Sequence, residues 1–237
     1  MTANPPTSAT TGISGAHALV KHFVARGVRY VYGVPGGDCS IDIIAAAEEQ
    51  GVKFILTHSE NSAAMMAAAA FQVNGSLGVV LTTRGPGLAN GVNGVACAML
   101  DRCGIVVISD GYENDQAFVS HQRFDQQRVL EPIVKGSLRI DDPTTLPALG
   151  PLLDLALARP AGPVYLEVTG KGMRGSAPIT SLPLQTAPSV KLAPHQPAMI
   201  AAARDMMKQA KRPVIIAGLQ TRDKGAADGL RVLAAKW

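Results

Sequence analysis

The sequence contains few charged and few aromatic residues. Only 17% of its 237 residues are charged and 4% are aromatic, and Trp237 is the single tryptophan. A core must therefore consist mainly of Ala, Val, Leu, Ile and Met, a composition that favours an α/β protein. Disorder is excluded, because 47% of the residues are hydrophobic. The net charge is +4, but the basic residues form no run, which argues against a nucleic-acid partner.

Cysteine is also scarce, and long apolar runs are missing. Cys39, Cys97 and Cys103 form no CxxC pair, and an odd number of cysteines without a signal segment predicts a reduced, cytoplasmic protein without disulfides. The longest run of small apolar residues, 63–71, is too short for a bilayer, which requires about 20 residues. We therefore expect no association with a membrane.

Common nucleotide and metal motifs are absent as well. No GxGxxG follows an expected strand and no GxxxxGK[ST] occurs, which argues against a nicotinamide or P-loop site. The histidines show no HExxH or similar spacing, so we predict no metal ligand in this chain.

What the sequence does contain is a regular alternation of helical stretches with short β-branched runs. This alternation predicts an α/β fold, with a parallel sheet that carries helices on both faces. Asp38 is the expected N-cap of the second helix. The other expected helices are 15–26, 61–72, 88–100 and 144–159, and the expected strands are 30–34, 52–56, 78–82, 105–109, 134–140 and 164–168.

Composition divides the chain into four parts. The Thr-, Ser- and Pro-rich residues 1–14 predict a disordered tail, and 15–169 the α/β domain. Residues 170–197 are rich in proline and polar residues and predict an extended linker. Residues 198–237 predict the truncated start of a second α/β domain, with helices at 198–210 and 225–236 and a strand at 213–218.

The candidate site residues follow expected strands, where an open α/β sheet binds its ligands. They are two glycine turns, Pro35-Gly36-Gly37 and Gly85-Pro86-Gly87, together with Glu60 and Asn90. Turns without bulky side chains let the backbone approach a flat ligand closely. Each feature has a simpler explanation, because such turns often have no other role and a glutamate at a helix N-terminus complements the helix dipole.

Taken in order, these motifs resemble the N-terminal pyrimidine-binding domain of thiamine-diphosphate enzymes. The resemblance covers about 15–168, and 210–218 resembles the opening of that family's central domain. Within the family, the two turns are most similar to the acetolactate synthase group of 2-oxo acid decarboxylases and carboligases. The motifs that carry the resemblance are Tyr32 to Gly37, Glu60 with Ala63, Met66 and Ala67, Gly85 to Gly87 with Asn90, Gln122 after His121, and Gly162 to Val168.

The resemblance implies specific roles. Glu60 would hydrogen-bond a pyrimidine ring nitrogen of thiamine diphosphate and stabilise the imino tautomer that deprotonates the thiazolium ring. The two glycine turns and Asn90 would contact the cofactor, and Gln122 would direct its amide at the substrate. The implied reaction is ylide addition to a 2-oxo acid and decarboxylation, followed by carbon–carbon bond formation or aldehyde release.

The resemblance also implies partners. Family members hold Mg²⁺ and the diphosphate in a later domain with a Gly-Asp-Gly motif, which this sequence lacks. The chain is therefore expected to be inactive alone, either as a fragment or as one subunit of a split enzyme. The resemblance implies a homodimer or homotetramer, or a separate diphosphate-binding subunit, and FAD is a possible further cofactor. A non-catalytic binding module is the alternative, because Ser59, Arg84 and Gly104 depart from the family pattern.

Overall fold

The computed structural model describes residues 12–116, 121–177, 196–222 and 224–236. The chain divides into two compact units, residues 1–188 and 189–237, and each is described by itself. Within the described residues, no helix combines the length and the apolar character that a membrane crossing requires.

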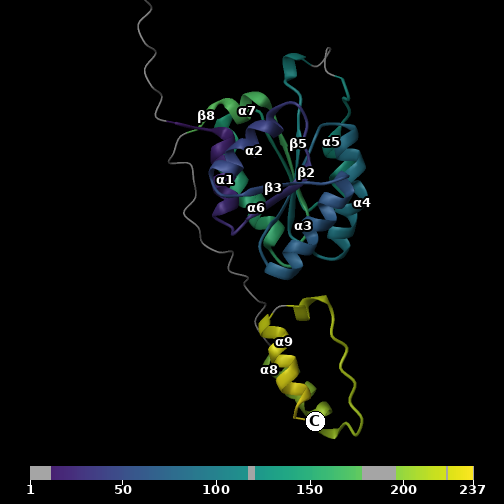
Figure 1. Ribbon diagram of the computed structural model, residues 1–237. Helices are drawn as coiled ribbons and strands as arrows, with labels where there is room; N and C mark the ends of the chain where they lie inside the picture. Colours follow the sequence, from purple (N-terminus) through teal and green to yellow (C-terminus); the bar gives the residue numbers. More distant parts are fainter. Residues whose placement is uncertain (1–11, 117–120, 178–195, 223, 237) are drawn as a thin grey trace, which may run out of the picture. The chain divides into compact units, whose positions relative to one another are not determined.

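The first unit is built on a six-stranded sheet in the order β3-β2-β4-β5-β7-β6 (Figure 1). Every neighbouring pair is parallel, which confirms the predicted α/β fold class. Strands β4, β5 and β7 are buried along their whole length, as expected for apolar strands covered on both faces. The strands are β2 (Tyr30–Val34), β3 (Lys53–Leu56), β4 (Gly78–Thr82), β5 (Ile105–Asp110), β6 (Ser137–Ile140) and β7 (Val164–Val168).

Helices cover both faces of this sheet (Figure 1). Side chains alternate along each strand, so Val79 and Leu81 join one hydrophobic cluster while Val80 joins the other. The first face is covered by α1 (Gly15–Val24), α2 (Cys39–Glu49) and α6 (Leu149–Leu157), and the second by α3 (Glu60–Asn74), α4 (Pro86–Leu100) and α5 (Gln126–Leu130).

Local sequence explains several helix ends. The Ser59 side chain accepts a hydrogen bond from the Ser62 amide and begins α3, and Gly75 ends this helix in the left-handed conformation. Asp38 does precede α2, but its carboxylate makes no capping hydrogen bond. It pairs instead with two arginines, Arg84 and Arg174, so the predicted capping role of its side chain was wrong.

The first unit also contains a small second sheet that the sequence did not predict. Strand β1 (Ile13–Ser14) pairs antiparallel with β8 (Ser176–Ala177), and α7 (Gly170–Arg174) precedes β8. The expected tail was therefore wrong for its last two residues, and the expected linker was wrong at its start. These pairs join residues that are far apart in the chain, so local composition did not reveal them. Residues 1–11 and 178–195 of those expectations lie outside the described residues.

Other helix and strand bounds shifted around prolines. A 3₁₀ helix (Pro143–Ala148) replaces the start of the expected helix 144–159, because the prolines there cannot donate the hydrogen bonds of a regular α-helix. Another 3₁₀ helix (Glu131–Ile133) follows α5, and β6 consequently begins at Ser137 rather than at residue 134.

The second unit contains α8 (Pro197–Gln209) and α9 (Lys224–Ala234), close to the expected helices. The strand expected at 213–218 does not form. Val214 and Ile216 are 86% and 91% exposed. A strand needs a hydrogen-bonded neighbour, and the described residues provide none for this segment, so its β-branched pattern alone was insufficient.

Candidate active site

The two glycine turns meet on the side chain of Thr83, which follows β4. A Cβ placed on Gly36 would lie 2.5 Å from Thr83 Oγ1, and one placed on Gly87 would lie 2.5 Å from Thr83 Cγ2. Any larger residue at position 36 or 87 would therefore collide with Thr83. The structure thus brings together the turns that follow β2 and β4, at the carboxyl edge of the sheet.

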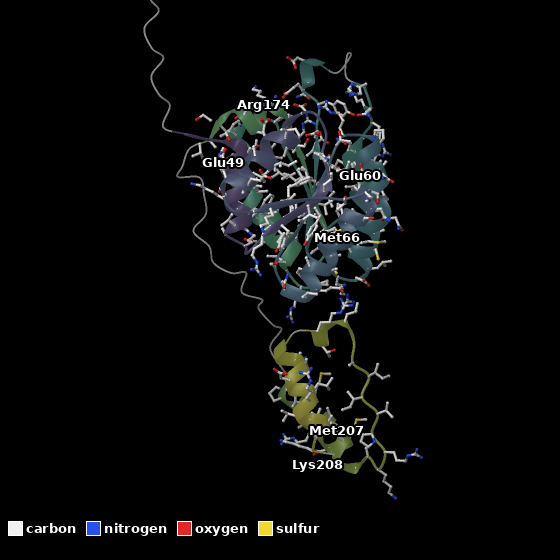
Figure 2. The ribbon with its side chains drawn as sticks, in the orientation of Figure 1. Glu49, Glu60, Met66, Arg174, Met207 and Lys208 are labelled. Carbon is white, nitrogen blue, oxygen red and sulfur yellow. The ribbon has the colours of Figure 1, made fainter. Side chains whose placement is uncertain are left out.

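Glu60 lies beside the second turn, at the first position of α3 (Figure 2). Its side chain is buried, and Asn90 Nδ2 donates a hydrogen bond to Glu60 Oε2 over 2.5 Å. The other oxygen, Oε1, faces Gly87, because a Cβ on Gly87 would lie 3.0 Å from it. Among the residues that the structure describes, Oε1 has no hydrogen-bond partner. One oxygen of the carboxylate is thus fixed and the other is available to a ligand.

The remaining predicted cofactor-binding residues form the open side of these turns. Pro35 is half-buried, and a Cβ on the exposed Gly37 would have no neighbour within 4 Å. Pro86 is exposed at the start of α4. These positions leave room for a flat group to approach the backbone.

Gln122 reaches the same turn through its backbone. Its φ is +63°, and a Cβ on Gly85 would lie 2.0 Å from the Gln122 carbonyl oxygen. The Tyr112 hydroxyl donates a hydrogen bond to that carbonyl. The Gln122 side chain is exposed. Its substrate-directed role therefore stays a prediction.

Asp110, at the end of β5, is a buried acid that the sequence analysis missed. Its Oδ1 accepts hydrogen bonds from the Ser40 amide at 2.9 Å and from Cys39 Sγ at 3.1 Å. Burial raises the pKa of the Asp110 carboxyl, and burial and this carboxylate together raise the pKa of the Cys39 thiol. Cys39 is therefore a hydrogen-bond donor rather than a nucleophile. An acidic residue directly after the expected strand 105–109, whose first four residues are apolar, was the signal that could have identified Asp110.

Arg84, a departure from the family pattern, is held in a row of alternating charges. It pairs with Asp38, whose other oxygen lies 3.0 Å from Arg174, and Arg174 in turn lies 2.8 Å from Asp42. The guanidinium carbon of Arg84 is also 5.2 Å from the centre of the Tyr112 ring. The structure thus accommodates this arginine beside the second glycine turn by neutralising its charge.

A cavity of about 610 Å³ adjoins the loop that carries Gln122. Its polar wall includes Arg139 and Glu167, which form an ion pair. The sequence analysis assigned no role to either residue, although a glutamate within the apolar strand 164–168 was a visible signal. The described residues that line it are Tyr112, Glu113, Asn114, Arg123, Phe124, Asp125, Gln126, Gln127, Arg139 and Glu167.

With this geometry in place, comparison with known proteins identifies the family. Residues 13–129 match the family described as "Thiamine pyrophosphate enzyme, N-terminal TPP binding domain". The first unit belongs to this family. The resemblance that the motifs carried is thereby confirmed.

Curated relatives resemble nearly the whole chain. The acetolactate synthase large subunit of Parasynechococcus marenigrum (strain WH8102) is 33% identical over 236 residues, covering 95% of this chain and 38% of the relative. Acetolactate synthase of Bacillus subtilis (strain 168) is 29% identical over 224 residues, covering 94% and 39%. The 2-hydroxyacyl-CoA lyase 1 of Mus musculus is 28% identical over 230 residues, covering 93% and 38%. The chain therefore spans about two fifths of the length of these relatives.

Proposed function

We propose that this chain forms the pyrimidine-binding part of a thiamine-diphosphate-dependent enzyme that decarboxylates or joins 2-oxo acids, as an acetolactate synthase does. The observation that carries the proposal is the Glu60 carboxylate, with Oε2 held by Asn90 and Oε1 available beside Gly87. The names of the relatives support the reaction class, since two are acetolactate synthases and one is a 2-hydroxyacyl-CoA lyase.

The residues of the site fit the pyrimidine ring of thiamine diphosphate. Glu60 Oε1 would accept a hydrogen bond from a protonated ring nitrogen, and the buried surroundings would strengthen that charge-assisted bond. Asn90 holds the carboxylate in one orientation. When bound, the cofactor supplies the nucleophilic carbon and the electron sink for decarboxylation of a 2-oxo acid.

The two glycine turns would hold the faces and edges of the ring. Gly36 and Gly87 already pack against Thr83 without space for a Cβ, so the backbone itself forms the wall of the site. In the proposal, Gln122 directs its amide at the substrate, and Mg²⁺ and the diphosphate are held by a domain outside this chain. A homodimer or homotetramer, or a separate subunit, would bring the two parts together.

The test is a Glu60→Gln substitution in the full-length protein, assayed with thiamine diphosphate, Mg²⁺ and pyruvate. Loss of the carboxylate should lower kcat by roughly 100- to 10,000-fold, the usual range for an acid or base in proton transfer. Glu48→Gln, at an exposed glutamate of α2, is the matched control and should retain activity. Full activity of Glu60→Gln would refute the role assigned to Glu60. Cofactor binding by the unmodified protein without pyruvate turnover would favour a non-catalytic module.

A further inference from the structure

We propose that Gln126 is a positioning residue that holds the Gly85-Pro86-Gly87 turn, and thereby the beginning of α4, against Glu60. Its effect on the cofactor rests on the proposed function, whereas its effect on the turn does not. The sequence analysis assigned no role to Gln126.

The Gln126 side chain is buried and fully hydrogen-bonded. Its Oε1 accepts a hydrogen bond from the Gly85 amide over 2.7 Å. Its Nε2 donates to the Asp110 carbonyl over 3.1 Å and to Glu167 Oε2 over 3.3 Å. Because both N–H groups and the oxygen have partners, only one orientation of this amide satisfies the site. The residue is only 1% exposed, so these bonds are shielded from bulk solvent.

The second glycine turn depends on support from outside its own segment. Gly85 precedes α4 with φ +63° and ψ −115°, a conformation that L side chains rarely adopt. As a glycine it has no side chain with which to cap the helix. The first hydrogen bond of α4 nevertheless starts here, since the Ala89 amide donates to the Gly85 carbonyl over 3.0 Å. Fixing the Gly85 amide therefore fixes the point at which α4 begins.

The beginning of α4 carries both contacts to the Glu60 carboxylate. Gly87 faces Oε1, and Asn90, one helical turn later, donates to Oε2. A shift of the turn would move both contacts together. Gln126 thus acts on Glu60 through the position of the helix and does not touch it.

The groups that bind the Gln126 side chain are themselves held by further polar contacts. Glu167 pairs with Arg139, and its Oε2 also accepts a hydrogen bond from the Tyr165 hydroxyl over 3.1 Å. The Tyr165 hydroxyl lies 2.7 Å from Ser109 Oγ. These residues come from β5, β6 and β7, so Gln126 ties the turn after β4 to the ends of three other strands.

The first experiment measures hydrogen–deuterium exchange at the Gly85 amide of the full-length protein without cofactor. Gln126→Met keeps a side chain of similar size but removes its polar atoms, and Gln127→Met, at the exposed next position of α5, is the control. We expect exchange at Gly85 to be at least tenfold faster in Gln126→Met and unchanged in Gln127→Met. Unchanged exchange in Gln126→Met would overturn the proposal.

The second experiment measures thiamine diphosphate affinity and kcat in the presence of Mg²⁺. Gln126→Met should lose about tenfold or more in one or both, whereas Gln127→Met should match the unmodified protein. Failure of the unmodified protein to bind the cofactor would refute the proposed function, while Gly85 exchange would still test the positioning role.

Exchanging the amide of Gln126 and the carboxylate of Glu167 tests the same hydrogen bonds even if the Gln126→Met variant does not fold. Gln126→Glu keeps an acceptor for the Gly85 amide but loses both donors and faces the Glu167 carboxylate, so it should lose cofactor affinity. Adding Glu167→Gln restores a donor between the two side chains and should recover Gly85 protection and part of that affinity. A double variant no better than Gln126→Glu would contradict the assigned hydrogen bonds.

Discussion

The helices on the two faces of the sheet pack in different ways. On the first face, large side chains such as Phe23, Leu19 and Ile43 are fully buried. On the second face, α3 contributes alanines, and Gly94 of α4 lies so close to α3 that a Cβ on it would be 2.7 Å from the Ala64 Cβ. Small residues therefore bring α3 and α4 together, and this close approach places Asn90 within hydrogen-bond distance of Glu60.

Charge differs between the faces in the same way. The helices α1, α2 and α6 carry charged residues such as Lys21, Glu48 and Asp154. On the second face, α3 carries only the buried Glu60 and α4 carries no charged residue, while the short helix α5 carries Arg128. Figure 2 labels Met66 on α3, where it is 40% exposed, and Leu100 of α4 is 79% exposed. An uncharged surface with exposed apolar side chains is typical of a protein contact. The surface of α3 and α4 is therefore the part of the second face that we expect a second subunit to cover.

The largest effect should follow from disturbing the contact between α3 and α4. A Gly94→Val side chain would meet the Asn61 carbonyl and the Ala64 side chain. We expect this change to lower the free energy of unfolding by about 3 kcal/mol, measured by urea denaturation. Gly91→Ala is the control, because a Cβ there would be 3.5 Å from the Glu60 Cβ, an ordinary contact. Equal free energies of unfolding for the two variants would contradict the tight packing of α3 against α4 at Gly94.

On the first face, the largest pH effect should come from His22. Burial, followed by the charge of Arg26, lowers the pKa of His22 to about 4 from its usual 6.5. Between pH 6.5 and about 4, the His22 imidazole therefore binds a proton in the unfolded chain but stays neutral in the folded chain. Stability should therefore fall by roughly 2 kcal/mol as the pH drops from about 6.5 to about 4. In a His22→Gln variant, urea denaturation should give a flatter curve over this range; an unchanged slope would contradict the assignment.

A charge on the exposed part of each face tests the expected subunit contact. Met66→Asp on α3 should weaken self-association of the full-length protein by roughly tenfold, about 1.4 kcal/mol, if the second face is covered. Val24→Asp, at a comparably exposed position of α1, should leave the association constant unchanged. Sedimentation equilibrium measures both association constants. Equal association constants for the two variants would contradict the proposed difference between the faces.

The smallest effect should come from the ion pair on the first face. Arg26 Nη2 lies 2.7 Å from Asp154 Oδ1, and the same group donates to the Gly150 carbonyl over 3.2 Å. We expect Asp154→Asn to cost about 1 kcal/mol of unfolding free energy, because the Asp154 side chain is 43% exposed and water screens the pair. Thermal unfolding at low and high salt should show that the difference in unfolding free energy between Asp154→Asn and the unmodified protein becomes smaller at high salt.

Sequence pattern predicted the parts of the fold that depend on local chemistry. The bounds of β2, β4 and β7 agree with the expected strands, because short runs rich in β-branched and apolar residues suffice to define them. The pattern failed for β1 and β8, whose pairing joins distant residues, and for 213–218, where β-branched residues form no strand.

By itself, the sequence determined the chain order of the six parallel strands and of the five longer helices of the first unit, the family, and the proximity of Glu60, Asn90 and the two glycine turns to one edge of the sheet. Only the tertiary structure decided that Thr83 lies between the turns, that Asp110 is buried beside the first, and that Gln126 holds the second. The physical reason is that strand order, which no local pattern encodes, brings residues from separate crossovers together, and a buried polar side chain binds the partners placed there.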